Sequence, residues 1–447
     1  MSIVKRLTSF LVLGTLLSAL AFASGQQQGA STKSGEVVTL KVLNYLDASQ
    51  ANSEREIKEI WGEFEKRYPN IKIEREDLFN EPFHQKTSAY IASGQLPDVL
   101  YMWPSGRSAE LHNKKLVKDL TPFLKADGLY DKYVPAAVAP QMAGYLAELP
   151  IGITFTHVLY VNTKLLADNG LSVPKTYEEL KAMVPKLKAK GLDTVLIAAQ
   201  DDWVMQSCLF SAIVGRIAGD KFIDDVLAGK AKFTDKPFVD SLKIVEDMFK
   251  SEIISKKALQ TPYGEVPALF AAGKAPFLID GDWRTGAFIT DKSTGVALIP
   301  PAKQKDIQLM VLPALPGEKF PNTSSAVVGV GFGMSAKIPA GSAKEKAAWE
   351  LIKFLNSEYV QKIRLESGAA FPSLKGVTVP SLEPIMQNRA KFYENYKGAY
   401  VLDAVLDPKV YGPINIGLQE IGLGTATPEQ VAAKVQKAFD EWKAGQK

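Results

Sequence analysis

Three tryptophans stand in polar segments that are rich in turn-forming residues. Trp103 follows an apolar run and precedes a proline, Trp203 follows two aspartates, and Trp283 lies within the segment DGDWR. Such segments are typical of loops or strand ends, and ligands of open α/β sheets bind beyond the carboxyl ends of the strands. An indole ring packs well on the apolar C–H face of a sugar. These residue types therefore indicate a site that holds a carbohydrate ring.

Charged side chains accompany the tryptophans and supply the polar half of such a site. Asp47, Asp202, Asp282 and Arg284 are the candidates, because ionised groups make strong hydrogen bonds to hydroxyl groups. Tyr45 comes just after the first predicted strand, next to Asp47, and joins the same set. Each aspartate is equally compatible with a helix cap or a turn, so the set is a stronger prediction than any one member.

The side chains needed for metal, cofactor or nucleophilic chemistry are sparse. His84, His112 and His157 lie in unrelated contexts without a zinc-binding spacing, and Cys208 is the only cysteine. The chain has no phosphate-binding glycine loop and no nucleophile elbow, and the glycines of residues 329–333 lack the dinucleotide-binding spacing. We therefore expect no metal, no cofactor and no enzymatic activity, and we interpret Cys208 as a small buried apolar residue.

The first residues have the pattern of a cleavable export signal. Two basic residues precede an uncharged run over residues 7–22, and the small-x-small sequence AFA stands at residues 21–23. The run is shorter than the roughly 20 residues that span a bilayer. Residues 1–23 are thus predicted to be a signal peptide, followed by a flexible leader over residues 24–36. Because no cysteine lies at the cleavage site, we expect a soluble periplasmic protein and not a lipoprotein.

Size and charge narrow the class of protein further. More than 400 of the 447 residues follow the leader, which exceeds the size at which a single core usually divides, so two lobes are expected. The chain has 53 Lys and Arg residues against 49 Asp and Glu residues, a net charge of +4. This small excess argues against nucleic acid as a partner.

Apolar patterns predict strands that alternate with helices. Strands are expected at residues 38–42, 71–73 and 98–102, and a capping box of Ser53 and Glu56 opens the first helix. The same order recurs further along the chain, and the C-terminal third is mainly helical. Alternating strands and helices predict an α/β fold with parallel sheets.

Several longer motifs extend over nearly the whole chain after the leader. They are PNIKI (69–73), SGQLPDV (93–99), LYVNTKLL (159–166), VPKTYEEL (173–180), AGKAPFLIDGDW (272–283) and AAWELIKFL (347–355). Together they resemble the family 1 extracellular solute-binding proteins, the maltose-binding-like receptors of ABC importers. The segment SGAAFPS (367–373) resembles the family's Gly-aromatic-x-Pro segment, with Phe371 displaced by one position.

The resemblance implies a two-lobed periplasmic binding protein fold with a hinge and a ligand cleft between the lobes. We expect an N-terminal lobe at residues 37–150 plus 300–332, a C-terminal lobe with a helical end at 156–294 plus 339–447, and hinge crossings at 151–155, 295–299 and 333–338. The resemblance also adds Gly331 and Phe332 as residues near the cleft. It implies a receptor that captures a mono- or oligosaccharide and docks on the membrane permease of an ABC importer, and we expect it to be a monomer.

Three other interpretations stay open. A receptor of the same fold for a polyamine, a phosphodiester or a peptide would need more carboxylates, or more arginines and helix N termini, around the aromatic rings. A periplasmic carbohydrate-active enzyme would need two carboxylates across a glycosidic bond, for which Asp201 and Asp202 are an example of a candidate pair. A sensor partner would report the ligand to a membrane kinase.

Overall fold

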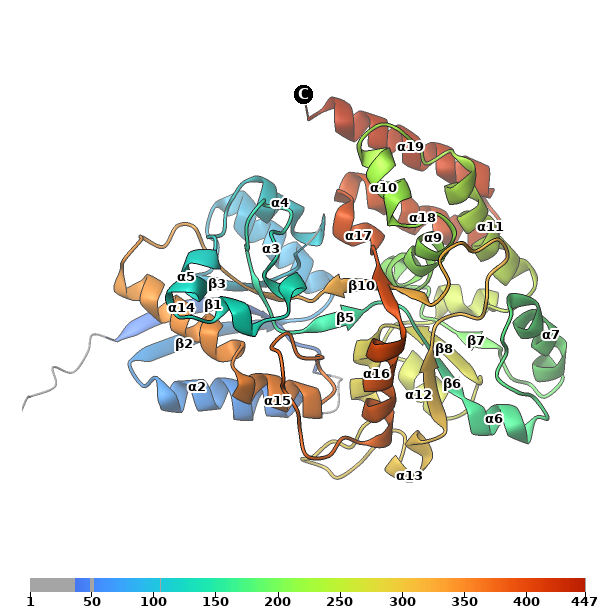
Figure 1. Ribbon diagram of the computed structural model, residues 1–447, viewed down its shortest axis with the longest axis horizontal. Coiled ribbons are helices and arrows are strands. Elements are labelled where there is room, and N and C mark those ends of the chain that lie inside the picture. The colour runs from blue at the N-terminus through green and yellow to red at the C-terminus, as the bar shows by residue number, and fades with distance from the viewer. Residues whose placement is uncertain (1–36, 49–51, 105, 447) are drawn as a thin grey trace, which may run out of the picture. The chain divides into compact units, whose positions relative to one another are not determined.

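Two hydrophobic cores organise the part of the chain that the structure describes. This computed structural model describes residues 37–48, 52–104 and 106–446, so the predicted signal peptide and leader lie outside the described residues. One core contains Leu40, Val99 and Phe332, and the other contains Val158 and Leu278. Each core belongs to its own sheet, which gives the two lobes that the size of the chain predicts (Figure 1).

The N-terminal lobe is built on a five-stranded sheet with the strand order β2-β1-β3-β11-β4. β1 (Val38–Tyr45) is parallel to both β2 (Ile71–Leu78) and β3 (Val99–Met102), as the alternating pattern predicts. β11 (Gly331–Met334) runs antiparallel to β3 and to β4 (Leu149–Pro150). All four residues of β3 are buried, which fits a central strand covered on both faces.

The C-terminal lobe is built on a four-stranded sheet with the order β7-β8-β6-β9. β7 (Val195–Leu196) is parallel to β8 (Phe277–Asp280), whereas β6 (Val158–Asn162) is antiparallel to β8 and to β9 (Ile307–Met310). The strands β1, β2 and β3 are present as predicted and the fold is α/β. Both sheets also contain antiparallel pairs, so the prediction of parallel sheets is only partly correct.

A third, small sheet connects the two lobes. β5 (Ile153–Phe155) is antiparallel to β10 (Thr323–Val328), which also pairs with β12 (Lys397–Ala399) (Figure 1). Gly152 and Gly329 let these segments approach closely, since an added Cβ would lie 2.4 Å from the carbonyl oxygen of Phe371 and 2.3 Å from that of Gly152, respectively. The crossing segments are thus packed backbone against backbone.

Helices cover the sheets of both lobes. Those of the N-terminal lobe are α1 (Ser53–Arg55), α2 (Gly62–Arg67), α3 (Glu81–Ser93), α4 (Ala109–Asn113), α5 (Thr121–Ala126), α14 (Ala343–Leu355) and α15 (Glu358–Glu366). Those of the C-terminal lobe are α6 (Thr163–Asp168), α7 (Tyr177–Lys188), α8 (Asp202–Val204), α9 (Ser211–Ile217), α10 (Asp220–Leu227), α11 (Lys236–Lys250), α12 (Val266–Ala271), α13 (Pro301–Gln304), α16 (Pro384–Asn395), α17 (Leu402–Val405), α18 (Pro408–Leu423) and α19 (Pro428–Ala444).

The lobe boundaries differ from the expected ones in the second half of the chain. Residues 300–315 were expected in the N-terminal lobe but belong to the C-terminal lobe, because β9 pairs with β6. Conversely, α14 and α15 were expected in the C-terminal lobe but pack in the N-terminal core. The expected crossings at 295–299 and 333–338 lie within single lobes, since Ile299 is in the C-terminal core and Met334 is in the N-terminal core. An amphipathic pattern shows that one face of a helix is buried but not which sheet it covers.

Helix caps follow the sequence in part. Thr427 and Gln430 form the complete capping box of α19, and the Ser342 side chain accepts from the backbone N–H of Glu345 at the start of α14. The predicted capping box of Ser53 and Glu56 is wrong. Asn52 is the N-cap of α1, and its side chain is hydrogen-bonded to another segment instead of the helix.

Candidate functional site

A cavity of about 280 Å³ lies between the two lobes, near the lower end of the range of small-molecule sites. Its wall combines residues from the carboxyl ends of β1 and β3, from the crossing segments and from the start of α8. β1 and β3 are parallel neighbours, so the residues that follow them meet at one edge of the sheet. The predicted interlobe ligand cleft is therefore present.

Aromatic rings from the N-terminal lobe form one side of the cavity. This first aromatic wall consists of Tyr45, Phe79, Tyr101 and Trp103. The ring of Tyr45 stacks on Tyr101 with centroids 5.4 Å apart and meets Trp103 edge-on at 5.2 Å. Burial raises the pKa of the Tyr45 hydroxyl, so that it stays protonated at neutral pH and is able to donate a hydrogen bond.

Three aromatic rings of the C-terminal lobe line the same cavity. This second aromatic wall consists of Trp203, Tyr263 and Trp283. The centroid of Trp203 lies 5.1 Å from Tyr263 and 6.2 Å from Trp283. The Trp283 indole N–H donates to the Tyr263 hydroxyl, whereas the buried indole nitrogen of Trp203 has no hydrogen-bond partner among the described residues. Because this nitrogen is buried, Trp203 contributes its ring to the cavity wall.

A buried ion pair supports the second aromatic wall from behind. Arg284 Nε lies 2.6 Å from Asp280 Oδ2, and both side chains are at most 2% exposed. The guanidinium of Arg284 lies 4.0 Å from the centre of the Tyr263 ring, and the Tyr263 hydroxyl donates to Asp280. Burial raises the pKa of the Asp280 carboxyl, although Arg284 opposes this shift. The pair holds the ring and the hydroxyl of Tyr263 in place.

The arginines that line the cavity are paired with carboxylates. Arg364 binds Glu56 through two nitrogens, at 2.6 and 3.3 Å. Arg107 Nε lies 2.8 Å from Asp403 Oδ2, and its guanidinium lies 5.4 Å from the centre of the Trp203 ring. Burial, and secondarily the charge of Arg107, lowers the pKa of His84 to about 4, so that this histidine is neutral at pH 7. Its Nε2 lies 3.4 Å from Arg107 Nη1.

Five of the residues predicted from the sequence are brought together here. Tyr45, Asp47, Trp103, Trp203 and Trp283 all line the cavity, although they come from distant parts of the chain. The signal that marked them was local composition, an aromatic or acidic residue next to a strand end, and the same signal also marked Asp202 and Asp282, which do not line the cavity.

The other five predicted residues do not line the cavity. Asp202 is exposed, and Arg284 is in the supporting ion pair. Asp282 is fully buried and binds the backbone N–H of Phe155, the hydroxyl of Tyr393 and the guanidinium of Arg389.

Gly331 and Phe332 lie inside the N-terminal sheet, where Phe332 packs against Trp61 and Tyr101. An added Cβ on Gly331 would lie 2.2 Å from the carbonyl oxygen of Leu149, so close strand packing explains this glycine. The prediction that these two residues reach the cleft is not supported by their placement.

Several cavity residues carried no recognisable signal in the sequence. Tyr263 and Arg107 lie in loops or short turns, and Arg364 and Asp403 lie on helices whose patterns indicate only packing. They are defined by partners far away in the sequence, such as Glu56 for Arg364. Phe79 and Asn80 also line the cavity and follow β2, so the rule that selected Tyr45, an aromatic or polar residue at the end of a strand, could have found them.

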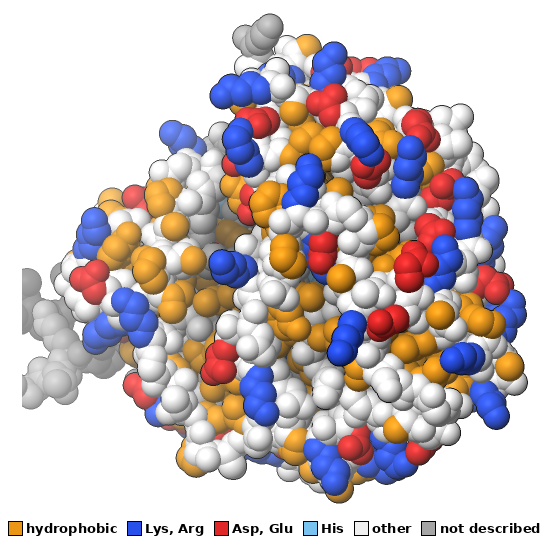
Figure 2. All heavy atoms as spheres, turned by 45° about the vertical axis from the view of Figure 1, so that its right-hand side comes forward, with side chains coloured by type: hydrophobic (Ala, Val, Ile, Leu, Met, Phe, Trp, Pro, Cys, Tyr) orange, Lys and Arg blue, Asp and Glu red, His pale blue; other side chains and the backbone are white. Residues whose placement is uncertain are grey.

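Other kinds of site find no support in the described part of the chain. The described residues contain no cluster of His, Cys, Asp or Glu suited to a metal ion. Among their helices, none is a candidate to span a membrane. On the face shown in Figure 2, Lys and Arg side chains are interspersed with Asp and Glu.

Comparison with known proteins gives a consistent result. The profile of the family described as bacterial extracellular solute-binding protein matches residues 48–362. The chain is 26% identical over 285 residues to the maltotriose-binding protein of Pyrococcus abyssi, in an alignment that covers 62% of this chain and 55% of that protein. It is 22% identical over 381 residues to the multiple sugar-binding protein of Streptococcus mutans, which covers 83% of each. The chain thus spans just over half the length of the first of these relatives.

Solved structures share the fold over nearly the whole chain. A chitin oligosaccharide binding protein is 25% identical, with a TM-score of 0.80 and coverage of 92% of this chain and 100% of that one. A maltose-bound protein of T. maritima is 20% identical, with a TM-score of 0.73 and coverage of 91% and 100%. The two-lobed fold and the resemblance seen in the sequence motifs are confirmed. The chain belongs to the bacterial extracellular solute-binding protein family.

Proposed function

We propose that this protein captures a carbohydrate in the interlobe cavity and delivers it to the permease of an ABC importer. The observation that carries the proposal is that aromatic walls from both lobes border one cavity. Sugar rings have apolar C–H faces that pack on aromatic rings. A ligand held between the two walls binds the closed form better than the open form, so its binding favours closure.

The charges of the cavity favour an uncharged ligand. Both arginines of the cavity wall, Arg107 and Arg364, already have carboxylate partners. Their partners Asp403 and Glu56 make up two of the three acidic residues of the wall, the third being Asp47. A phosphodiester would need unpaired cations. A polyamine carries several positive charges and would need more than the single acidic residue by which this wall exceeds its arginines. The hydroxyl groups of a neutral sugar suit these paired polar groups, which already balance one another's charge.

The names of the similar proteins support the same ligand class. Maltotriose, multiple sugars and chitin oligosaccharides are what those proteins are described as binding. A mono- or oligosaccharide is accordingly the proposed ligand of this chain. The residues proposed to contact it are those of the two aromatic walls, with Asp47 as a polar contact.

Further parts of the proposal concern location and chemistry. We propose export through the signal peptide at residues 1–23, a soluble periplasmic protein without a lipid anchor, and a monomer that makes and breaks no covalent bond in its ligand. The mass of the exported protein, measured by mass spectrometry, tests cleavage of the signal peptide, since cleavage should leave Ser24 as the new N terminus.

A thermal-shift screen tests the ligand class. The mature protein is unfolded in guanidinium chloride and refolded to remove bound solutes, and is then heated with maltotriose, chitin and xylan oligosaccharides, spermidine, a glycerophosphodiester or a peptide mixture. A ligand at about 100 times its Kd adds about 2.7 kcal/mol of stability, which raises the midpoint by a few degrees. A response to a neutral saccharide alone is expected. A response to spermidine or the phosphodiester alone would overturn the ligand class, and cleavage of the saccharide on prolonged incubation would overturn the non-enzymatic part.

A further inference from the structure

The N-terminal lobe touches the C-terminal lobe directly at Gly106. This residue begins a 3₁₀ turn over Gly106–Ser108 and is buried against the end of α17. A Cβ on Gly106 would lie 2.0 Å from the carbonyl oxygen of Leu406 and 2.6 Å from that of Asp403. Its φ is outside the left-handed region, so the local conformation itself does not require glycine. A larger residue at position 106 is therefore excluded by the contact with the other lobe and not by the backbone conformation.

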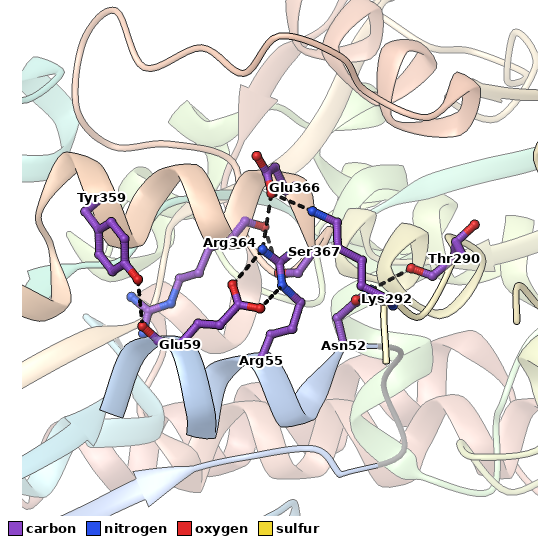
Figure 3. A network of polar contacts seen from close by, with 9 residues as sticks. All are labelled: Asn52, Arg55, Glu59, Thr290, Lys292, Tyr359, Arg364, Glu366 and Ser367. Carbon is purple, nitrogen blue, oxygen red and sulfur yellow. Dashed lines mark hydrogen bonds and ion pairs between the residues drawn. The ribbon is translucent and has the colours of Figure 1, made fainter. Parts of the chain in front are cut away.

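A second direct contact lies at Asn52, which inserts its side chain into a loop of the C-terminal lobe. Asn52 Nδ2 donates to the Thr290 carbonyl at 3.0 Å, and Asn52 Oδ1 accepts from the Lys292 N–H at 2.9 Å (Figure 3). The backbone N–H of Asn52 donates to Asp291 Oδ2 at 2.8 Å. Asn52 is 4% exposed, and its φ of 63° is one that asparagine tolerates better than most residues.

The loop that receives Asn52 is shaped in advance. Asp291 Oδ1 accepts from the backbone N–H groups of Ser293 and Thr294, each at 2.9 Å. Hydrogen bonds from the Ser293 hydroxyl, from the backbone N–H of Asn52 and from that of Thr294 lower the pKa of Asp291, so it is ionised at neutral pH. An ordered loop loses little conformational freedom when Asn52 docks.

Ion pairs join the lobes next to both contacts. Lys292 Nζ lies 2.8 Å from Glu366 Oε2, and Glu366 also binds Arg55 at 3.2 Å (Figure 3). Next to Gly106, the pair of Arg107 with Asp403 crosses between the lobes, with side chains only 17% and 6% exposed. The two contact regions are separate, since one uses the segment before α1 and the other the turn before α4.

We propose that these contacts form a clasp, made of Gly106 with α17 and of Asn52 with residues 290–292, that gives the protein a closed population without ligand. The contacts join protein to protein and need no group from a ligand. Because the free energy between open and closed forms is typically small, a few such hydrogen bonds suffice to populate the closed form. The clasp also sets affinity, because the apparent Kd of a ligand that binds the closed form equals its intrinsic Kd divided by the closed fraction.

The distance between the lobes in refolded, ligand-free protein tests this proposal. Cys208 is buried and is expected to react poorly, so cysteines introduced at the exposed positions Lys114 and Lys230 are labelled selectively with nitroxides. Double electron–electron resonance then gives the distribution of distances between the lobes. The wild-type protein should show a short and a long component, and Gly106→Ala should lower the ratio of short to long at least tenfold because its Cβ prevents contact with α17.

A second variant and a control keep the test decisive. Asn52→Gly keeps the left-handed conformation accessible but removes the two side-chain hydrogen bonds, and we expect a reduction of about fivefold. Gly412→Ala is the control, since a Cβ there meets no atom within 4 Å. The clasp is refuted if the refolded wild-type protein shows only the long distance, or if Gly106→Ala and Asn52→Gly leave the ratio unchanged. Neither result depends on which ligand the cavity binds.

Discussion

Trp203 and Trp283 lie with ring centroids 6.2 Å apart and ring planes inclined by 40°. Tyr263 fixes both, because it contacts the Trp203 ring and accepts the indole N–H of Trp283. This fixed arrangement makes the second aromatic wall a preformed surface, and binding to it costs little side-chain entropy.

Truncation of Trp283 should weaken binding without unfolding the protein. Trp283→Ala removes one of the three tryptophan rings that line the cavity. We therefore expect the Kd for the saccharide selected by the thermal-shift screen to rise at least tenfold, which corresponds to about 1.4 kcal/mol. Trp283→Phe should retain part of the affinity. Isothermal titration calorimetry measures both, with Trp442→Ala as a control because Trp442 lies on α19 outside the cavity. Equal losses in Trp283→Ala and Trp442→Ala would mean that Trp283 is only a packing residue.

Replacement of Arg284 should lower the stability of the protein, because Arg284 supports the second aromatic wall and does not line the cavity. Arg284→Met leaves the Asp280 carboxylate buried without its cation, and loss of one partner of a buried pair costs about 3–5 kcal/mol. The midpoint of urea unfolding should fall accordingly. Lys58→Met is the matched control, because the pair of Lys58 with Glu54 is exposed and its loss should leave the midpoint unchanged. An Arg284→Met protein of normal stability that no longer binds saccharide would restore Arg284 as a ligand contact.

Asp202 should be dispensable for binding, in contrast to the prediction from its sequence neighbours. It is exposed and does not line the cavity, so Asp202→Ala should change the Kd less than twofold. Asp403→Ala is the informative comparison, because it leaves Arg107 without its carboxylate in the cavity wall and should weaken binding by more than tenfold. A reversed order of these two effects would contradict the described geometry.

Stability should fall as the pH is lowered below about 6.5. Burial lowers the pKa of His157 to about 4, from an ordinary value of 6.5, and Nε2 accepts from the Leu312 N–H while Nδ1 faces the Cys208 carbonyl. The unfolded chain therefore takes up the proton first, so stability is complete above pH 6.5 and is lost as the pH falls toward 4. His157 contributes a slope of up to about 1.4 kcal/mol per pH unit in this window. Urea titrations from pH 5 to 7 should show that the free energy of unfolding depends less steeply on pH in His157→Gln than in the wild-type protein. An equal dependence on pH would contradict the role given to His157.

The sequence was most informative where local pattern decides structure. The strands β1, β2 and β3 and the position of Trp103 just beyond β3 follow from alternation, apolar runs and turn-forming residues. Trp203 and Trp283 lie instead in α8 and in a 3₁₀ helix just after β8. Parallel strands then bring the ends of β1 and β3 together, so Tyr45 and Trp103 were predicted to lie at one site. Family membership followed from motifs that extend over the chain.

Predictions from the sequence were wrong where the direction of a side chain within a short helix decides whether it reaches the cavity. Asp282 and Arg284 flank Trp283 in a 3₁₀ helix, in which successive side chains point about 120° apart. When Trp283 faces the cavity, its neighbours face elsewhere and enter buried ion pairs with Arg389 and Asp280. Similarly, Tyr263 and Arg364 were missed because their roles depend on partners that only the folded chain brings near them.

Calorimetric titration of the refolded protein with neutral oligosaccharides tests the central claim most directly. We predict saturable one-to-one binding of at least one oligosaccharide, lost in both Trp103→Ala and Trp203→Ala, which remove one ring from each aromatic wall. Loss in both variants would show that the ligand bridges the two lobes. Binding that survives both substitutions, or binding of spermidine or a phosphodiester in place of every saccharide, would contradict it.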